Sequence, residues 1–303
     1  MSEKYGCGFG AMATGDDVYV VGTDSEMEDD DVDHGVVFER NKGKWIGWSV
    51  EFRVAAVAYA LQAGMFFLVG QNGGVEVTTL SETWDEAVDS SENGPSSVRA
   101  LNCASVIGQH VYVAGMRRQV YRRNLSSREW TRFDRGCFIE PASKDIRGFN
   151  SIHGMTESEI FAVGLRGELW HCLNANWMQL DSPTNTSLYV VRELSSGEVL
   201  VGGGLGLLLR GSATGFSRIA QDKTEAAITG IAEFGGMTFI ADERGGIFQL
   251  IGDQLTFVPA VPGTDEGGGQ LDANNNALIY VRSDSVLMFD GSTWRDATPP
   301  DDA

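Results

Sequence analysis

A short apolar strand that ends in Gly recurs along this chain and decides its fold. It reads VYVVG at 18–22, FFLVG at 66–70, VYVAG at 111–115, IFAVG at 160–164 and EVLVG at 198–202. Two weaker copies, MTFIA at 237–241 and LIYVR at 278–282, have Ala241 and Arg282 in the place of the Gly. Successive copies begin 48, 45, 49, 38, 39 and 41 residues apart. A period of this length is typical of propeller blades.

Each copy has companion strands. A strand of small residues precedes it, as in VAAVAYAL at 54–61, and an alternating strand follows it, as in QVYRRNL at 119–125. A turn then leads to a large side chain that we expect to pack between blades. These side chains are Trp45, Trp84, Trp130, Trp177, Phe216, Leu255 and Trp294. Four strands in each of seven units predict an all-β chain, a single seven-bladed β-propeller of four-stranded antiparallel blades with almost no helix.

The repeat also predicts where the blades lie. We expect residues 1–303 to be a single propeller domain, with blades at about 6–52, 53–99, 100–147, 148–187, 188–227, 228–267 and 268–303. The stretch 8–14 is expected to be the innermost strand of the first blade, and 293–298 the outermost strand of the last. Closure of the ring would then depend on packing between two blades, without a blade shared by both ends of the chain.

The composition indicates an acidic protein of the cytoplasm. The net charge is −19 and the pI about 4.5, and such a charge repels nucleic acid and anionic lipid. We therefore expect no nucleic-acid or membrane partner. The N-terminus shows no signal peptide, and four widely spaced cysteines predict free thiols. On its own, the chain is expected to be a monomer.

A motif near the C-terminus resembles a known family. FDGSTWRD at 289–296 is similar to the Asp-box of the sialidase and BNR-repeat propellers, and the Gly-ended strands strengthen that resemblance. The chain also resembles the propellers of photosystem II assembly factors. The resemblance implies a seven-bladed propeller. It leaves open a glycan-active or glycan-binding sialidase-like function and a role as an assembly or scaffold factor.

No catalytic or metal-binding motif is present. His34, His110, His153 and His171 lack the spacing of zinc ligands. The segment GGGLGLL at 202–208 lacks the Lys-Ser/Thr ending of a phosphate loop and is interpreted as a turn. We therefore predict a protein that is not an enzyme and has no cofactor or metal.

Two segments stand out by their charge. DSEMEDDDVD at 24–33 has seven acids in ten residues, between the second and third strands of the first blade. It is either a solvated, mobile insert or an acidic lure for a basic surface. Residues 100–147 have nine basic and four acidic residues, a net +5. These arginines could bind phosphate, but pairing with neighbouring acids or a contribution to a bipolar interaction surface is favoured. Strand alternation places Arg122 and Arg123 on opposite faces of their sheet.

The long, charged loops are expected on one side of the propeller, because links between second and third strands emerge on the same side as links between blades. Function is commonly carried by loops on a rigid scaffold. The predicted partner-binding residues are Asp24, Glu26, Glu28, Asp29, Asp30, Asp31, Asp33, Glu92, Arg117, Arg118, Asp242, Glu243, Asp265 and Glu266. The hypothesis is a non-catalytic protein-binding propeller, most specifically a bacterial immunity protein that neutralises a cognate toxin. An acidic blocker suits a basic, nuclease-type toxin.

Overall fold

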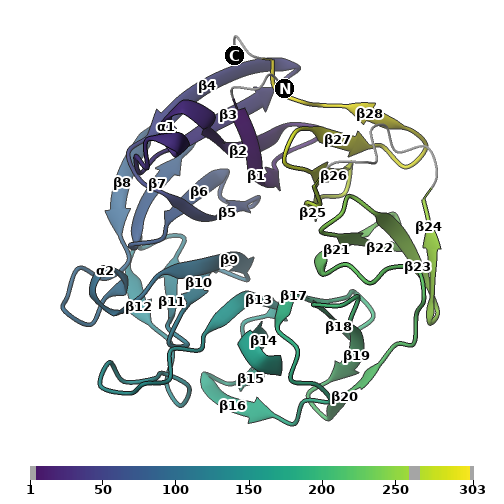
Figure 1. Cartoon of the computed structure of the whole chain (residues 1–303). Helices are drawn as coiled ribbons and strands as arrows, with labels where there is room; N and C mark the ends of the chain where they lie inside the picture. Colours follow the sequence, from purple (N-terminus) through teal and green to yellow (C-terminus); the bar gives the residue numbers. More distant parts are fainter. Residues whose placement is uncertain (1–4, 259–266, 301–303) are drawn as a thin grey trace. The chain divides into compact units, whose positions relative to one another are not determined.

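The computed structural model describes residues 5–258 and 267–300 (Figure 1). The contacts of the chain divide it into two compact units, Met1–Arg53 with Ala220–Ala303, and Val54–Ile219. The strands form seven four-stranded antiparallel sheets, each from one continuous stretch of chain. This confirms the seven predicted blades of four antiparallel strands. The prediction that residues 1–303 are a single domain with the stated blade boundaries stays a prediction.

The first unit contains blades 1, 6 and 7. Blade 1 consists of β1 (Tyr5–Met12), β2 (Val18–Asp24), β3 (Gly35–Asn41) and β4 (Lys44–Val50). Blade 6 consists of β21 (Ile228–Phe234), β22 (Met237–Asp242), β23 (Ile247–Ile251) and β24 (Gln254–Phe257). Blade 7 consists of β25 (Gln270–Ala273), β26 (Leu278–Val281), β27 (Val286–Phe289) and β28 (Trp294–Asp296).

The second unit contains blades 2 to 5. Blade 2 consists of β5 (Val54–Ala60), β6 (Met65–Gly70), β7 (Gly74–Thr78) and β8 (Thr83–Ala87), and blade 3 of β9 (Leu101–Ile107), β10 (His110–Gly115), β11 (Val120–Asn124) and β12 (Trp130–Arg132). Blade 4 consists of β13 (Phe149–Thr156), β14 (Glu159–Gly164), β15 (Leu169–Leu173) and β16 (Asn176–Leu180), and blade 5 of β17 (Leu188–Glu193), β18 (Val199–Gly203), β19 (Leu208–Ser212) and β20 (Gly215–Arg218).

Helix is confined to short segments in the described residues. These are α1 (Ser25–Asp29), α2 (Pro95–Val98) and the 3₁₀ turn η1 (Leu165–Gly167). None of them is long and apolar enough to cross a membrane.

The repeated Gly-ended strand is the second strand of its blade. In β6, β10 and β14 every residue after the first is buried, as expected for a strand covered on both sheet faces. The terminal Gly is required by the first strand of the same blade. A Cβ atom on Gly22 would overlap the carbonyl group of Gly6, and one on Gly164 would overlap that of Gly148.

Tryptophans of the fourth strands link neighbouring blades, as predicted. Trp177 of β16 is buried, and its Nε1 donates to the carbonyl oxygen of Phe133 at 2.8 Å. Its ring stacks on Phe149 with centroids 5.7 Å apart. Trp130 of blade 3 donates to Glu86 of blade 2 at 2.8 Å.

The Asp-box motif forms the turn between β27 and β28. Asp290 Oδ1 accepts hydrogen bonds from the backbone amides of Ser292 at 2.8 Å and Thr293 at 2.9 Å. These bonds to the backbone of Thr293 and to Ser292 lower the pKa of the exposed Asp290 carboxyl. In this chain the motif therefore stabilises the hairpin between β27 and β28.

Blades 1 and 7 join the two ends of the chain without sharing a strand. The backbone amide of Met12 donates to Asp272 Oδ2 at 2.8 Å, and Asn274 Nδ2 donates to the carbonyl oxygen of Ala13 at 2.6 Å. Strand β1 also contacts β25 and β26. The closure expected from the sequence, by packing between blades, is thus present in the first unit.

Candidate protein-binding surface

The acidic insert, residues 24–33, connects β2 to β3 and begins as the short helix α1. Asp24 caps this helix, because its Oδ1 accepts from the backbone amides of Glu26 at 3.0 Å and Met27 at 3.4 Å. Part of the insert therefore has a defined backbone conformation, and Asp24 stabilises it by capping the helix.

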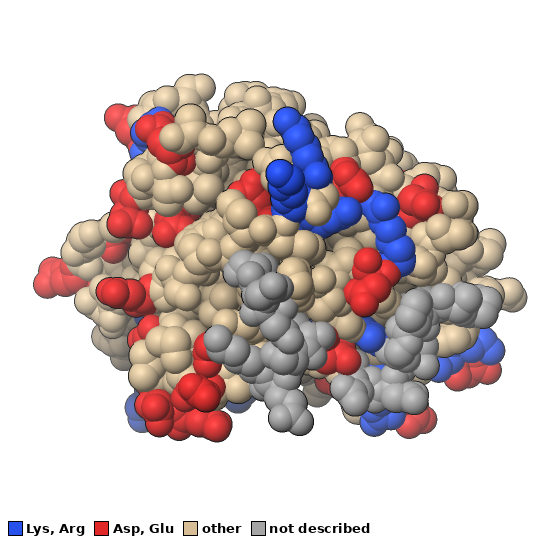
Figure 2. All heavy atoms as spheres, turned by 90° about the horizontal axis from the view of Figure 1, so that it is seen from above, with Lys and Arg blue, Asp and Glu red and all other residues tan. Residues whose placement is uncertain are grey.

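The carboxylates of the insert lie in solvent. Residues 25–33 are all exposed, and Arg53 contacts two of them, Asp31 at 3.1 Å and Asp33 at 3.4 Å. Among the described residues no cation pairs with the remaining acids, Glu26, Glu28, Asp29 and Asp30. Acidic side chains are exposed at several places on the face in Figure 2.

Two apolar side chains lie among these charges. Met27 is 36% exposed and Val32 is 43% exposed. An exposed surface that combines carboxylates with apolar side chains can attract a basic protein from a distance and then lose water on contact with it.

A buried histidine fixes both ends of the insert. His34 is 2% exposed. Its Nε2 accepts from the backbone amide of Asp24 at 2.8 Å, and its Nδ1 donates to the carbonyl oxygen of Val32 at 2.7 Å. This pattern assigns the proton of the neutral ring to Nδ1. From the sequence, His34 is considered only as a zinc ligand, and this structural role is not predicted. Its position directly after the insert is the signal that could have indicated it.

Two further predicted residues of the first unit, Asp242 and Glu243, contact backbone. Asp242 is 3% exposed and accepts from the Thr224 hydroxyl at 2.6 Å and from the Gly246 amide at 2.8 Å. Glu243 is exposed and accepts from the Ala227 amide at 3.0 Å. Asp242 thus supports a turn, and Glu243 offers its outer side to solvent. Asp265 and Glu266 lie outside the described residues.

In the second unit the predicted arginines are engaged inside the protein. Arg117 is buried, and its guanidinium donates to the carbonyl oxygens of Glu140 at 2.7 Å and Ser143 at 3.2 Å. Arg118 donates from Nε to the buried Glu168 at 3.0 Å. Both side chains hold the link after blade 3 in place, whereas Glu92 in the link before it is exposed.

Other arginines of blade 3 pair with carboxylates, which is one of the two interpretations that the sequence favours. These pairs are Arg123 with Glu86 at 2.6 Å, Arg128 with Glu82 at 2.9 Å, Arg132 with Asp134 at 2.9 Å and Arg147 with Asp145 at 2.6 Å. Hydrogen bonds from Arg147 hold the pKa of Asp145 below its ordinary value. Arg122 and Arg123 lie against different rings, Phe133 and Phe67, as expected for opposite sheet faces.

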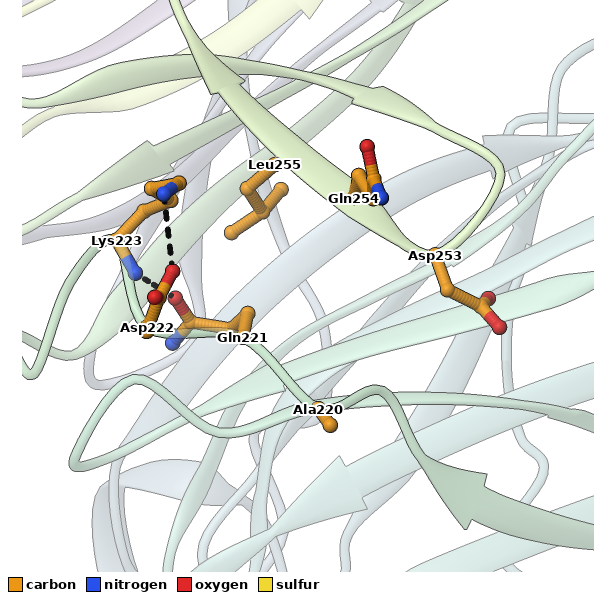
Figure 3. Close-up of a pocket in the computed structure, with 7 residues that line it drawn as sticks. All are labelled: Ala220, Gln221, Asp222, Lys223, Asp253, Gln254 and Leu255. Carbon is orange, nitrogen blue, oxygen red and sulfur yellow. Dashed lines mark hydrogen bonds and ion pairs between the residues drawn. The ribbon is translucent and has the colours of Figure 1, made fainter.

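The described loops do not form a metal site, and one pocket carries no recognisable chemistry. No three His, Cys, Asp or Glu side chains gather around one point in the described part of the chain. The pocket lies between the link 220–223 and the turn 253–255 (Figure 3). There Lys223 already pairs with Asp222 at 3.0 Å.

Comparison with known proteins identifies the fold. No family model matches the chain. The WD40 β-propeller domain of Doa1 superposes with a TM-score of 0.70 at 11% identity, over 95% of this chain and 94% of that chain. The chain is a seven-bladed β-propeller. The structure of YCF48 bound to D1 peptide gives a TM-score of 0.69 at 10% identity, over 99% and 94% of the two chains.

A relative is also found by sequence. The Immune protein Tsi7 of Pseudomonas aeruginosa is 26% identical over 297 residues, which is 94% of this propeller and 94% of the relative. The similarity therefore extends along nearly the whole length of both chains.

Proposed function

We propose that this propeller is a bacterial immunity protein, which binds and neutralises a toxin made by the same cell. The observation that carries the proposal is the similarity to the Immune protein Tsi7 along 94% of both chains. The propeller acts by binding and performs no chemistry. It works in the cytoplasm, where a nuclease toxin would find its substrate, and the toxin is expected to be basic.

The acidic insert is the part that we propose to attract this toxin. Four of its acids have no cation beside them in the described structure, and the whole segment 25–33 is exposed. Because unpaired surface charge acts over about 8 Å at physiological ionic strength, it steers a basic partner before contact. Met27 and Val32 would then contribute apolar area once the surfaces meet.

The anchoring of the insert lowers the cost of binding. His34 joins the amide of Asp24 to the carbonyl group of Val32, and Arg53 pairs with Asp31 and Asp33. A segment fixed at both ends loses less conformational entropy when it is bound. The acids would then face the nucleic-acid groove of the toxin, in the positions that phosphates occupy.

The test is association with the product of the adjacent gene. We expect the two proteins to co-purify and the propeller to block the activity of the toxin. The combined variant Glu26→Gln, Glu28→Gln, Asp29→Asn and Asp30→Asn should slow association about 10-fold at low salt and flatten its salt dependence.

A matched control removes the same charge elsewhere. Asp85→Asn, Glu129→Gln, Asp181→Asn and Glu225→Gln change four exposed acids on other loops and strands, and association should slow much less. If the adjacent product does not bind, the immunity function is wrong. If it binds and both variants slow equally, the function stands and the insert is not the site.

A further inference from the structure

A leucine in blade 5 combines a left-handed backbone conformation with high exposure. Leu205 lies in the turn between β18 and β19 with φ +58° and is 82% exposed. The left-handed region is unfavourable for a residue with a branched side chain, whereas Gly, Asn or Asp occupies it readily. An outlier of this kind points to a use outside the folded chain.

The corresponding turn of blade 4 is built in the same way. Arg166 has φ +57° and is exposed, and like Leu205 it precedes a Gly with positive φ. Both turns bond to the same residue of the link between the blades. The Arg166 amide donates to Ser187 Oγ at 3.4 Å, and the Gly204 amide donates to the Ser187 carbonyl oxygen at 3.0 Å. The tips of the two turns therefore project beside one another.

Tyr189 adds an aromatic ring to this surface. It is 41% exposed, and a Cβ atom on Gly204 would lie 3.8 Å from its Cε2. In the part of the chain that the structure describes, neither the Tyr189 hydroxyl nor the Arg166 guanidinium has a hydrogen-bond or ion-pair partner. The nearby Arg118 and Arg147, in contrast, are paired with carboxylates.

We propose that Arg166, Tyr189 and Leu205, the turn patch, form a second contact surface for the toxin, which presents an apolar hollow for Leu205 and a carboxylate for Arg166. This inference rests on the proposed function. Tyr and Arg are among the residue types most enriched at binding hot spots. Leu205, which is 82% exposed, would remove a whole apolar side chain from water on contact with a hollow. The unpaired positive charge of Arg166 selects a carboxylate on the partner, whereas the acidic insert would repel the same carboxylate.

The experiment compares Leu205 with an equally exposed leucine. Leu80, in the turn between β7 and β8, is 88% exposed and lies outside the turn patch. Dissociation of the toxin complex is measured by surface plasmon resonance for Leu205→Asn, Arg166→Gln, Tyr189→Ala and Leu80→Asn. We expect Leu205→Asn to dissociate at least 10-fold faster and the other two patch variants about 5-fold faster, with Leu80→Asn unchanged. Thermal unfolding of Leu205→Asn should occur at the same or a higher temperature, because Asn tolerates the left-handed conformation.

The outcomes separate the two proposals. A wild-type propeller that fails to bind the toxin contradicts the immunity function and the turn patch together. If the wild type binds and Leu205→Asn dissociates at the rate of Leu80→Asn, the immunity function stands and the turn patch is wrong. Sedimentation velocity tests whether a second copy of this chain binds the turn patch instead of the toxin. A dimer of the propeller that Leu205→Asn abolishes would assign the patch to that second copy.

Discussion

The acidic insert of blade 1 and the arginines of blade 3 are the charge extremes of the sequence, and their side chains have opposite surroundings. In the insert, Arg53 is the cation within contact of the described carboxylates. In blade 3, Arg123 is fully buried against Glu86, and Arg118 is 11% exposed against Glu168. The carboxylates of the insert are thus exposed to solvent, whereas much of the charge in blade 3 is neutralised inside the protein.

The difference teaches that a local excess of charge in a sequence does not by itself indicate free charge. Asp134 and Asp145, which lie in the same stretch, pair with two of these arginines. The acids against the most buried arginines come from other blades, Glu86 from blade 2 and Glu168 from blade 4. They lie 37 and 50 residues from their partners in the sequence. In the described part of the chain, Arg53 pairs with two acids of the insert, and the acids at positions 26 and 28–30 have no cation beside them.

The largest effect is expected at Glu86. Its carboxylate accepts hydrogen bonds from Arg123, Trp84 and Trp130 at 2.6–2.8 Å. Glu86→Gln leaves the buried Arg123 without a counter-charge, so the free energy of unfolding should fall by about 3–5 kcal/mol. Urea denaturation measures the loss.

The control for Glu86 is an exposed pair of the same chemistry. Glu82 and Arg128 have side chains 55% and 47% exposed, and Glu82→Gln should cost at most about 1 kcal/mol. Equal losses for the two variants would mean that the Glu86 network adds nothing beyond a surface pair.

Part of the Glu86 effect should depend on pH. Burial alone would raise the pKa of Glu86, but hydrogen bonds from Arg123, Trp84 and Trp130 bring it below the ordinary value of 4.5. A carboxyl group with a lowered pKa in the folded state stabilises the protein above its unfolded pKa, and this contribution is lost as the pH falls through the folded value. The stability gap between the wild type and Glu86→Gln should therefore narrow below about pH 4.5. A gap that stays constant down to pH 3 would contradict the lowered pKa.

The next effect concerns the anchor of the insert. His34→Ala removes the acceptor of the Asp24 amide and the donor to the Val32 carbonyl group. Leaving such groups unpaired costs about 1–3 kcal/mol. We also expect faster proteolytic cleavage within residues 24–33. A variant with wild-type stability and wild-type cleavage would show that the insert holds its conformation without the histidine.

The smallest effect is expected in the insert itself. The four amide substitutions at positions 26 and 28–30 replace exposed side chains without ion pairs in the described structure. Each should change the free energy of unfolding by at most about 0.5 kcal/mol. Thermal and urea denaturation check this value. A large loss would make the insert a structural element, as the arginines of blade 3 are.

The fold could be predicted because its signals are local and repeated. An apolar strand such as IFAVG indicates a propeller blade within a few residues, because its last residue, Gly164, lies against the backbone of Gly148. The roles of Arg117 and Arg118 could not be predicted, because their partners are carbonyl groups and a carboxylate placed by other loops. The contact role proposed for Leu205 could not be predicted either, because its left-handed conformation and its exposure are properties of the folded structure.

The seam between blades 1 and 7 has a consequence for how such a chain can change. Each blade is one uninterrupted stretch, and the bonds from Asp272 and Asn274 to blade 1 replace a covalent connection there. Side-chain bonds also cross a boundary within the chain, where Asn102 of blade 3 donates to the Phe149 carbonyl of blade 4 at 2.9 Å. The seam thus lies between two complete four-stranded sheets. A gene for this protein can be shortened, extended or circularly permuted in units of one blade without cutting a sheet in two.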